Sequence, residues 1–345
     1  MFSVEQADIK ENPRQRRNYV YLEHTQSLCS KCLRVVDAKI IRTDDKKIVL
    51  RKWCAEHGFE SCLLHSDADW YLHAQKYNRP GDIPLKFPTE VERGCPYDCG
   101  VCPDHEQHMC LGLIDLTDDC NLACPTCFAD SKGSAYLTMD QIKAALDGFI
   151  EQEGVGAVIQ FSGGEPTMHP QIVEAVKEAV DRPTEVVMIN TNGIKFAQDE
   201  DLIKRLVDVS ENKLEIYLQF DGFTDEVHQK IRGAKLADIK MKSIENMLKH
   251  GLPINLAAVI QRGVNEDQVG KIVEFGIETK GIRGVNFQPA FFAGRYDHDM
   301  NPMDRVTNTE IMDRLEKQTD GMFRKTDFMP LPCSHPSEIA QIGRA

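Results

Sequence analysis

The chain has 345 residues, of which 28% are charged and 41% hydrophobic, values typical of a soluble globular protein with about two domains. Its formal net charge of -13 argues against a nucleic-acid or anionic-membrane surface, because such surfaces need clustered lysine and arginine. No apolar run is long enough to span a membrane and residues 1–25 lack a signal-peptide core, so we expect a cytoplasmic protein without a transmembrane segment. The twelve cysteines fall in CxxC-type groups, which indicates metal ligation rather than disulfides.

Residues 1–18 are predicted to form a disordered polar arm, and residues 19–66 a small metal-binding module. Apolar and polar residues alternate over 35–50, which indicates a β-hairpin between two metal-binding turns. This arrangement is typical of a zinc-ribbon or rubredoxin-like site with one tetrahedral zinc or iron ion. The predicted ligands are Cys29, Cys32, Cys54 and His57. Cys62 is the alternative fourth ligand, and free or buried cysteines are the alternative to a metal site.

A second cysteine-rich loop lies in the predicted connector, residues 67–110. It has the pattern CxxxCxxC followed by a fourth cysteine, and four thiolates in one compact loop can hold a complete [4Fe–4S] cluster. The predicted ligands are Cys95, Cys99, Cys102 and Cys110. A zinc site that uses His105 or His108 is the alternative. Because this loop lies close to the next cysteine loop in the sequence, we expect an auxiliary cluster there to pass or hold an electron.

The third cysteine loop contains Cys120, Cys124 and Cys127 in the spacing CxxxCxxC. An alternating apolar run over 111–116 predicts a strand just before it, and a capping box that starts at Thr138 predicts a helix after it. Three thiolates suit a [4Fe–4S] cluster with one open iron, since a fully held cluster needs four. An open metal position can bind a substrate or cosubstrate. A zinc loop is the alternative for this spacing taken alone.

From residue 111 to residue 330 the chain alternates predicted strands and helices. Five further strands are predicted at 157–161, 185–190, 214–220, 254–260 and 284–288, and helices near 170–180, 200–209, 225–250 and 266–279. Near-continuous apolar strands separated by helices indicate a parallel sheet that is covered on both faces. The predicted fold class is therefore α/β, and six units fit a partial (β/α)6 barrel that is open on one side.

Polar residues follow each of these predicted strands, at the edge of the sheet where function gathers in such barrels. The candidate residues are Gly163, Gly164, Glu165, Pro166, Asn192, Gln219 and Asp221. Each of them taken singly has an alternative role in a turn or a helix cap, where these residue types are common. Polar residues at six successive strand ends would be unusual in a protein that only needed a core.

The cysteine loop, followed by Ser162-Gly-Gly-Glu-Pro166 after the next strand, resembles the radical S-adenosylmethionine (SAM) superfamily. The resemblance implies a TIM-like barrel in which the amino and carboxylate groups of SAM chelate the open iron. It implies that reductive cleavage then gives methionine and a 5′-deoxyadenosyl radical, which abstracts a hydrogen atom. The electron would come from a low-potential donor such as ferredoxin or flavodoxin.

The resemblance also implies roles for single residues. The residues implied to bind SAM are Gly163, Gly164, Glu165, Pro166, Asn192, Gln219, Asp221 and Arg232. In the superfamily the glycine-rich turn and its glutamate receive the SAM amino group. By their position at the strand ends alone, the two amides and the aspartate would face the ribose or methionine part of SAM. Arg232 would pair with the SAM carboxylate through its guanidinium fork, or would be an ordinary charge on a helix surface.

Two features of the cysteine loops narrow the resemblance. Thr126 stands where most members have an aromatic residue, and Phe128 follows the third cysteine. Together with the preceding cysteine loop, this pattern resembles a branch that contains class D radical SAM methyltransferases and archaeal tetraether (membrane-spanning lipid) synthases. The implied substrate is a reduced pterin-like small molecule or a lipid, modified at an unactivated carbon by methyl transfer or by C–C coupling of hydrocarbon tails.

The last predicted segment, residues 331–345, departs from that branch. It contains Cys333 but lacks the further cysteines that usually follow, so we expect a truncated or reduced C-terminal region. One alternative function is therefore that of a shortened paralogue with altered activity. Another is that of a non-catalytic iron–sulfur or zinc protein that transfers electrons. Binding of SAM separates an enzyme from such a carrier.

Overall fold

The computed structural model describes residues 17–78, 82–94, 97–98, 100–103, 108–129, 131, 133–296 and 300–330. Tertiary contacts divide the chain into two units, Met1–Tyr71 and Leu72–Ala345. None of the described helices is long and apolar enough to cross a membrane.

The first unit is built on a four-stranded antiparallel sheet with the order β1-β2-β3-β4. The strands are β1 (Tyr19–Leu28), β2 (Val35–Thr43), β3 (Ile48–Cys54) and β4 (Gly58–His65). The predicted hairpin is the β2–β3 pair, whose turn is closed by a hydrogen bond from the Lys46 amide to the Thr43 carbonyl (3.1 Å). The outer strands β1 and β4 were not predicted, because their apolar positions are half-exposed and do not alternate cleanly. Helix α1 (Ala68–Ala74) and a 3-10 turn (Gln75–Tyr77) follow.

The second unit contains a six-stranded parallel sheet with the order β10-β9-β8-β7-β6-β5. The strands are β5 (Gly112–Thr117), β6 (Ala157–Gly163), β7 (Thr184–Thr191), β8 (Leu214–Gln219), β9 (Ile254–Ile260) and β10 (Ile282–Pro289). Among the described strands, β5 and β10 each pair with one neighbour only, so the sheet is an open barrel. The predicted α/β class and the partial (β/α)6 barrel are confirmed.

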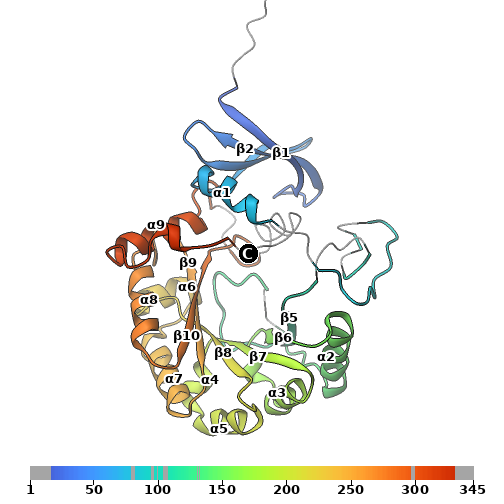
Figure 1. Cartoon of the computed structure of the whole chain (residues 1–345), viewed down its shortest axis with the longest axis vertical. Coiled ribbons are helices and arrows are strands. Elements are labelled where there is room, and N and C mark those ends of the chain that lie inside the picture. The colour runs from blue at the N-terminus through green and yellow to red at the C-terminus, as the bar shows by residue number, and fades with distance from the viewer. Residues whose placement is uncertain are drawn as a thin grey trace, which may run out of the picture. The chain divides into compact units, whose positions relative to one another are not determined.

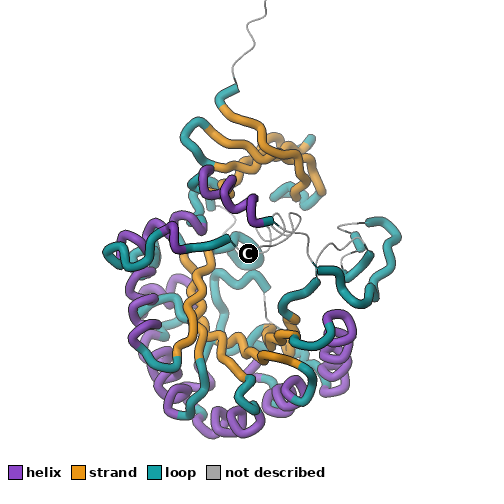
Figure 2. The backbone as a smooth tube through the Cα atoms, in the orientation of Figure 1, coloured by secondary structure: helices purple, strands orange, loops and turns teal. Residues whose placement is uncertain are grey.

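Helices form an outer layer around this sheet, as Figures 1 and 2 show. They are α2 (Met139–Glu153), α3 (Ile172–Val180), α4 (Ile194–Gln198), α5 (Glu200–Val209), α6 (Asp225–Arg232), α7 (Ala237–Lys249), α8 (Val269–Glu278) and α9 (Asn308–Gln318). Short 3-10 turns lie at Pro166–Met168 and Lys325–Asp327. The strand residues that face the helices, such as Leu116, Phe161 and Ile216, are fully buried and form the core with the apolar faces of the helices.

Two helix predictions can be compared directly with the structure. The capping box of Thr138 and Gln141 is present at the start of α2, as predicted. The single helix predicted over 225–250 is wrong: α6 ends at Gly233, which adopts a left-handed conformation (φ 77°). A Cβ atom at Gly233 would lie 3.3 Å from the Ala123 carbonyl oxygen, so this glycine also allows the helix end to approach the cysteine loop.

Candidate active site

All the sequence motifs of the barrel lie at one edge of the sheet. β5 ends at Thr117, just before Cys120, and β6 ends at Gly163, in the Gly-Gly-Glu-Pro turn. β7 ends next to Asn192, and β8 ends at Gln219. The strands are parallel, so their carboxyl ends meet at one edge, and the predicted placement of the motifs at the strand ends is confirmed.

The glycine-rich turn is packed against the backbone that leads into the cysteine loop. The Gly164 amide donates to the Thr117 carbonyl (2.7 Å) and the Glu165 amide to the Asp119 carbonyl (2.8 Å). Gly163 has a φ of 123°, and a Cβ atom there would lie 2.2 Å from the Thr117 oxygen. A Cβ atom at Gly164 would lie 2.1 Å from the Asp119 oxygen. Only glycine fits at both positions, and the turn thereby fixes the start of the cysteine loop.

The Glu165 side chain joins the ends of β6 and β7 inside the protein. Its carboxylate is 1% exposed and accepts hydrogen bonds from the Thr167 amide (3.1 Å) and hydroxyl (2.6 Å). It also accepts from the Thr191 hydroxyl (2.7 Å) and the Asn192 amide (2.8 Å). Four protein donors satisfy most of the acceptor capacity of a carboxylate. The contact of Glu165 with SAM therefore stays a prediction, and the role visible in the fold is to hold two strand ends together.

Asn192 connects the end of β7 to the cysteine loop. Its side-chain amide donates to Asn121 Oδ1 (2.7 Å), next to Cys120, and its carbonyl accepts from Lys240 Nζ (2.5 Å). Lys240 is completely buried, and burial lowers the pKa of its ammonium to about 7. A buried lysine that bonds a backbone carbonyl rigidifies the turn after β7.

A buried ion pair lies behind Cys124. Arg232 donates to both carboxylate oxygens of Asp221, at 2.6 and 2.8 Å, and the Val259 amide donates to Asp221 Oδ1 at 3.0 Å. Burial by itself would raise the pKa of Asp221, but the charge and hydrogen bonds of Arg232 keep it below its usual value. Arg232 is thus neither a surface charge nor an unpaired cation, and its pairing with SAM stays a prediction.

The three cysteines of the loop are half-buried thiols. Burial raises the pKa of Cys120 to about 11 and also raises that of Cys124, although nearby Arg232 opposes the second shift. Thiols that resist ionisation by themselves become thiolates when a metal replaces the proton. The donor set therefore fits an iron–sulfur centre.

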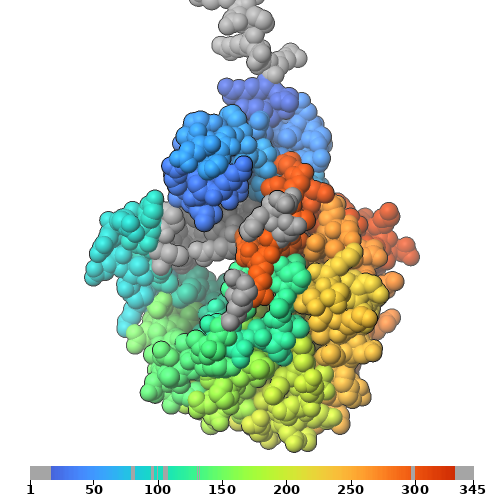
Figure 3. Space-filling model, turned by 180° about the vertical axis from the view of Figure 1, so that it is seen from behind, coloured from blue at the N-terminus to red at the C-terminus, as the bar shows by residue number. Residues whose placement is uncertain are grey.

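The loop that follows β10 holds the far side of the cysteine loop, and the two lie next to each other in Figure 3 (orange and green). The Arg295 amide donates to the Cys127 carbonyl (2.9 Å), and the Arg295 guanidinium donates to the Ser131 carbonyl. A Cβ atom at Gly294 would lie 2.4 Å from the Cys127 oxygen, so glycine is required for this approach. The backbone of the cysteine loop is therefore fixed at both ends.

The interior face of the barrel is polar along the same strands. In the strand register Asp115 lies opposite Ser162, and Asn190 opposite Tyr217. Asn190 donates to the Ser162 hydroxyl (3.2 Å) and accepts from Gln219 (3.4 Å). Further along the sheet Gln288 donates to the Tyr217 hydroxyl (2.9 Å), and Asn255 donates to Glu215 (2.6 Å). The space enclosed by the open barrel is therefore lined by hydrogen-bonding groups.

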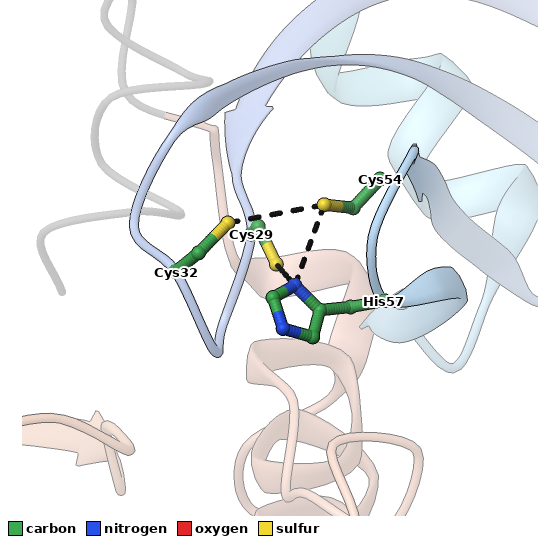
Figure 4. A group of neighbouring side chains, drawn as sticks. All are labelled: Cys29, Cys32, Cys54 and His57. Carbon is green, nitrogen blue, oxygen red and sulfur yellow. Dashed lines mark hydrogen bonds between the residues drawn. The ribbon is translucent and has the colours of Figure 1, made fainter.

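The first unit contains a compact group of four metal-ligand types, shown in Figure 4: Cys29, Cys32, Cys54 and His57. Their ligand atoms all lie within 4.8 Å of one another, and no other such group is found among the residues that the structure describes. Cys32 Sγ lies 3.8 Å from Cys54 Sγ, and His57 Nδ1 lies 3.5 Å from both Cys29 Sγ and Cys54 Sγ.

These distances match one tetrahedral ion. Metal–sulfur bonds of about 2.3 Å and metal–nitrogen bonds of about 2.0 Å place two sulfurs about 3.8 Å apart, and a sulfur and a nitrogen about 3.5 Å apart. Cys62 does not belong to the group, since its thiol donates to the Leu63 carbonyl (3.6 Å). The sequence offered His57 or Cys62 as the fourth ligand, and the fold brings His57 to the site.

Two family models match the chain. The radical SAM superfamily model matches residues 114–276, and the HMPTM N-terminal zinc ribbon domain matches residues 21–66. The 7,8-dihydro-6-hydroxymethylpterin dimethyltransferase of Methanocaldococcus jannaschii is 37% identical over 320 residues, which cover 91% of this chain and 62% of that protein. The chain belongs to the radical SAM superfamily. It is an enzyme of the radical SAM class with an N-terminal zinc-ribbon domain, as the resemblance of the cysteine loop implied.

Further proteins are similar to parts of the chain. The mitochondrial GTP 3′,8-cyclase of Arabidopsis thaliana is 29% identical over 236 residues, 66% of this chain and 56% of the cyclase. The crystal structure of Streptococcus suis SuiB bound to the precursor peptide SuiA superposes with a TM-score of 0.50 at 14% identity, and covers 92% of this chain and 72% of that one. This last likeness concerns the fold alone. The chain spans 62% of the length of the dimethyltransferase and 56% of the length of the cyclase.

The auxiliary cluster predicted in the connector is only partly within the described residues. Cys95 and Cys99 lie outside them, as does Cys333. Cys102 is buried and Cys110 is exposed. A cluster held by these four cysteines stays a prediction.

Two buried polar residues near the radical SAM site, Lys240 and His228, were not predicted from the sequence. Lys240 lies on the buried face of α7, with Ile244 and Met247 at helical spacing, and this periodicity was the available signal. His228 is also fully buried, neither ring nitrogen has a hydrogen-bond partner among the described residues, and burial lowers its pKa to about 4. His228 lies on α6 with the buried residues Ile231 and Arg232, so its burial too follows from the helix period.

We predict that His57→Ala lowers the metal affinity of the zinc ribbon by at least about 100-fold, because the tetrahedral group loses one of its four ligands. This loss should exceed the effect of removing a residue that only hydrogen-bonds to a metal ligand. Metal content per chain after dialysis against a weak chelator measures this, and tryptophan fluorescence reports the fold, because Trp53 and Trp70 both lie in the first unit. Cys62→Ser is the matched control and is expected to retain the metal.

Proposed function

We propose that this radical SAM enzyme cleaves one SAM molecule reductively and uses the 5′-deoxyadenosyl radical to take a hydrogen atom from a pterin-like small molecule. A methyl group from a second SAM molecule then replaces that hydrogen, S-adenosylhomocysteine leaves, and the reductant supplies one electron for the cleavage and one for the methyl transfer. The observation that carries the choice of substrate is the polar interior face of the barrel. From Asp115 on β5 to Gln288 on β10, the interior positions include carboxylates, amides and hydroxyls. A polar heterocycle can exchange hydrogen bonds with such groups, whereas hydrocarbon tails would remove them from water and offer no hydrogen bond in return. The likeness to a hydroxymethylpterin dimethyltransferase supports the same choice.

In this proposal the thiolates of Cys120, Cys124 and Cys127 hold a [4Fe–4S] cluster, which supplies the electron for cleavage when it is bound. The glycine-rich turn positions the cysteine loop through the backbone hydrogen bonds that the Gly164 and Glu165 amides donate. The neighbouring polar strand ends, including Asn192 and Gln219, bind SAM. The chain would take its electron from a low-potential donor such as ferredoxin or flavodoxin.

The accessory metal sites have supporting roles in the proposal. Cys29, Cys32, Cys54 and His57 hold one zinc or iron ion, which stabilises the ribbon without taking part in the chemistry. Cys95, Cys99, Cys102 and Cys110 hold an auxiliary cluster that passes or stores an electron.

The proposal is tested by the yield of 5′-deoxyadenosine from the full chain after anaerobic reconstitution with iron and sulfide. SAM and a reductant are supplied with 7,8-dihydro-6-hydroxymethylpterin, with a long-chain diether lipid, or with neither. We expect the pterin alone to stimulate cleavage and to gain mass corresponding to methylation. Stimulation by the lipid alone would overturn the choice of substrate. No cleavage by protein that is fully loaded with iron would favour the electron carrier.

A further inference from the structure

Two polar side chains on the interior face of the barrel make no hydrogen bond with the described residues, unlike the polar groups around them. They are Asp115 on β5 and Gln160 on β6. These strands pair with Leu113 opposite Gln160 and with Asp115 opposite Ser162, so the two side chains are diagonal neighbours. Both alternate with core residues of their own strands, Ile114 and Phe161, which places them on the interior face.

Neither side chain has a hydrogen bond or an ion pair with any of the described residues. Gln160 is nevertheless only 6% exposed. Gln160 is not among the residues whose polar atoms are sealed off without a partner, so its amide remains accessible and can bond to a group that arrives from outside the protein. Asp115 lines a cleft of about 380 Å³ that is also bordered by Gly163 and Gly164 of the glycine-rich turn. The cleft therefore joins the unpartnered carboxylate to the strand-end site.

We infer that Asp115 and Gln160 form the recognition site for the 2-amino-4-oxopyrimidine edge of the substrate. The Asp115 carboxylate accepts from the ring N–H and the exocyclic amine, and the Gln160 amide donates to the oxo group. Both protein groups thereby gain the partners that they lack. Leu113 and Met188 flank Gln160 in the strand register and offer an apolar surface to the face of the ring.

The inferred site rests on the proposed function, because it names the part of a pterin that this enzyme would recognise. The same pyrimidine edge occurs in guanine, so the chemistry alone admits a pterin or a guanine nucleotide. Partial burial raises the pKa of the Asp115 carboxyl, because desolvation is not offset by a neighbouring cation. A neutral donor edge with two N–H groups suits such a carboxylate.

Binding to the reconstituted full chain tests the inference. The probes are 6-hydroxymethylpterin, GTP, and 6-hydroxymethyllumazine, which carries an oxo group in place of the 2-amino group. Asp115→Asn is expected to weaken pterin binding by about 10- to 100-fold, the range for hydrogen bonds to a charged group, and to remove the preference for pterin over lumazine. Gln160→Met is expected to weaken pterin binding by about 10-fold. The exposed strand residue Glu185 provides the control Glu185→Gln, which should bind like the wild type.

The ratio of the affinities for pterin and for lumazine is measured within each variant, so this ratio remains informative if a variant folds less well. SAM affinity is measured alongside and should not change. Pterin binding that is unaltered in both variants overturns the inference while the proposed function stands. A loss of SAM affinity in Asp115→Asn with intact pterin selectivity also overturns it, and assigns Asp115 to SAM. Tighter binding of GTP than of pterin supports the recognition site but overturns the pterin substrate.

If the chain binds pterin but pterin does not stimulate the cleavage of SAM, the recognition site stands and the proposed function fails. A wild-type chain that binds neither pterin nor GTP contradicts the recognition site.

Discussion

Replacing Cys124 with alanine is expected to lower 5′-deoxyadenosine formation by more than about 100-fold. Loss of a direct metal ligand should have a larger effect than loss of a residue that hydrogen-bonds to a ligand, which typically costs about 10- to 100-fold. Cys124 is half-buried, and Arg232 lies beside its thiol. Two remaining thiolates cannot hold the cluster that three thiolates leave with one open iron. The yield of 5′-deoxyadenosine and the iron content per chain measure the effect.

Cys62→Ala is the control for this experiment. Cys62 is also half-buried, but its thiol donates to the carbonyl of its neighbour Leu63, and it lies outside the metal-ligand group found among the described residues. The control should retain both iron and activity. Wild-type iron content and activity in Cys124→Ala would show that Cys124 is not a ligand.

Replacing Asp221 with asparagine is expected to destabilise the barrel unit by about 3–5 kcal/mol, the typical cost of leaving one partner of a buried ion pair uncompensated. Asp221 is fully buried, and Arg232 donates two hydrogen bonds to it. Urea unfolding followed by far-UV circular dichroism measures the free energy of unfolding, because α2 to α9 all lie in the second unit. Tryptophan fluorescence follows the first unit separately.

In the wild type, the contribution of the ionised Asp221 side chain to the free energy of unfolding should be lost in acid. The folded pKa of Asp221 is lowered, so its stabilising effect is present above the usual carboxyl range and is lost as the pH falls through the folded pKa. Stability of Asp221→Asn should therefore fall less steeply in acid than that of the wild type.

The exposed pair of Lys204 and Asp201 provides the matched control. Their charged atoms lie 2.7 Å apart, and the Asp201 side chain is 84% exposed. Asp201→Asn is expected to leave the free energy of unfolding almost unchanged, as is usual for surface pairs. A similar small effect in Asp221→Asn would contradict a stabilising role for the buried pair.

Most of the barrel was predictable because its signals are local. Apolar strands and amphipathic helices have their own periods, and the polar residues that follow each strand then lie at one edge of any parallel sheet. The prediction failed over 225–250, where the apolar period continues past Gly233. There the first helix ends at Arg232 because Gly233 adopts the left-handed C-cap conformation, a local signal that the apolar period outweighed in the prediction.

Short motifs and residue periods in the sequence encode the family, the six strand–helix units, the cysteine loop of Cys120 to Cys127 and the cysteines of the ribbon. The residue that completes the ribbon group is seen only in the folded chain, where His57 meets Cys29 across 28 positions of sequence. The same is true of the ion pair between Arg232 and Asp221 and of the unpartnered side chains of Asp115 and Gln160. These arrangements depend on the register and curvature of strands far apart in the chain, and burial raises the cost of leaving a polar group without a partner.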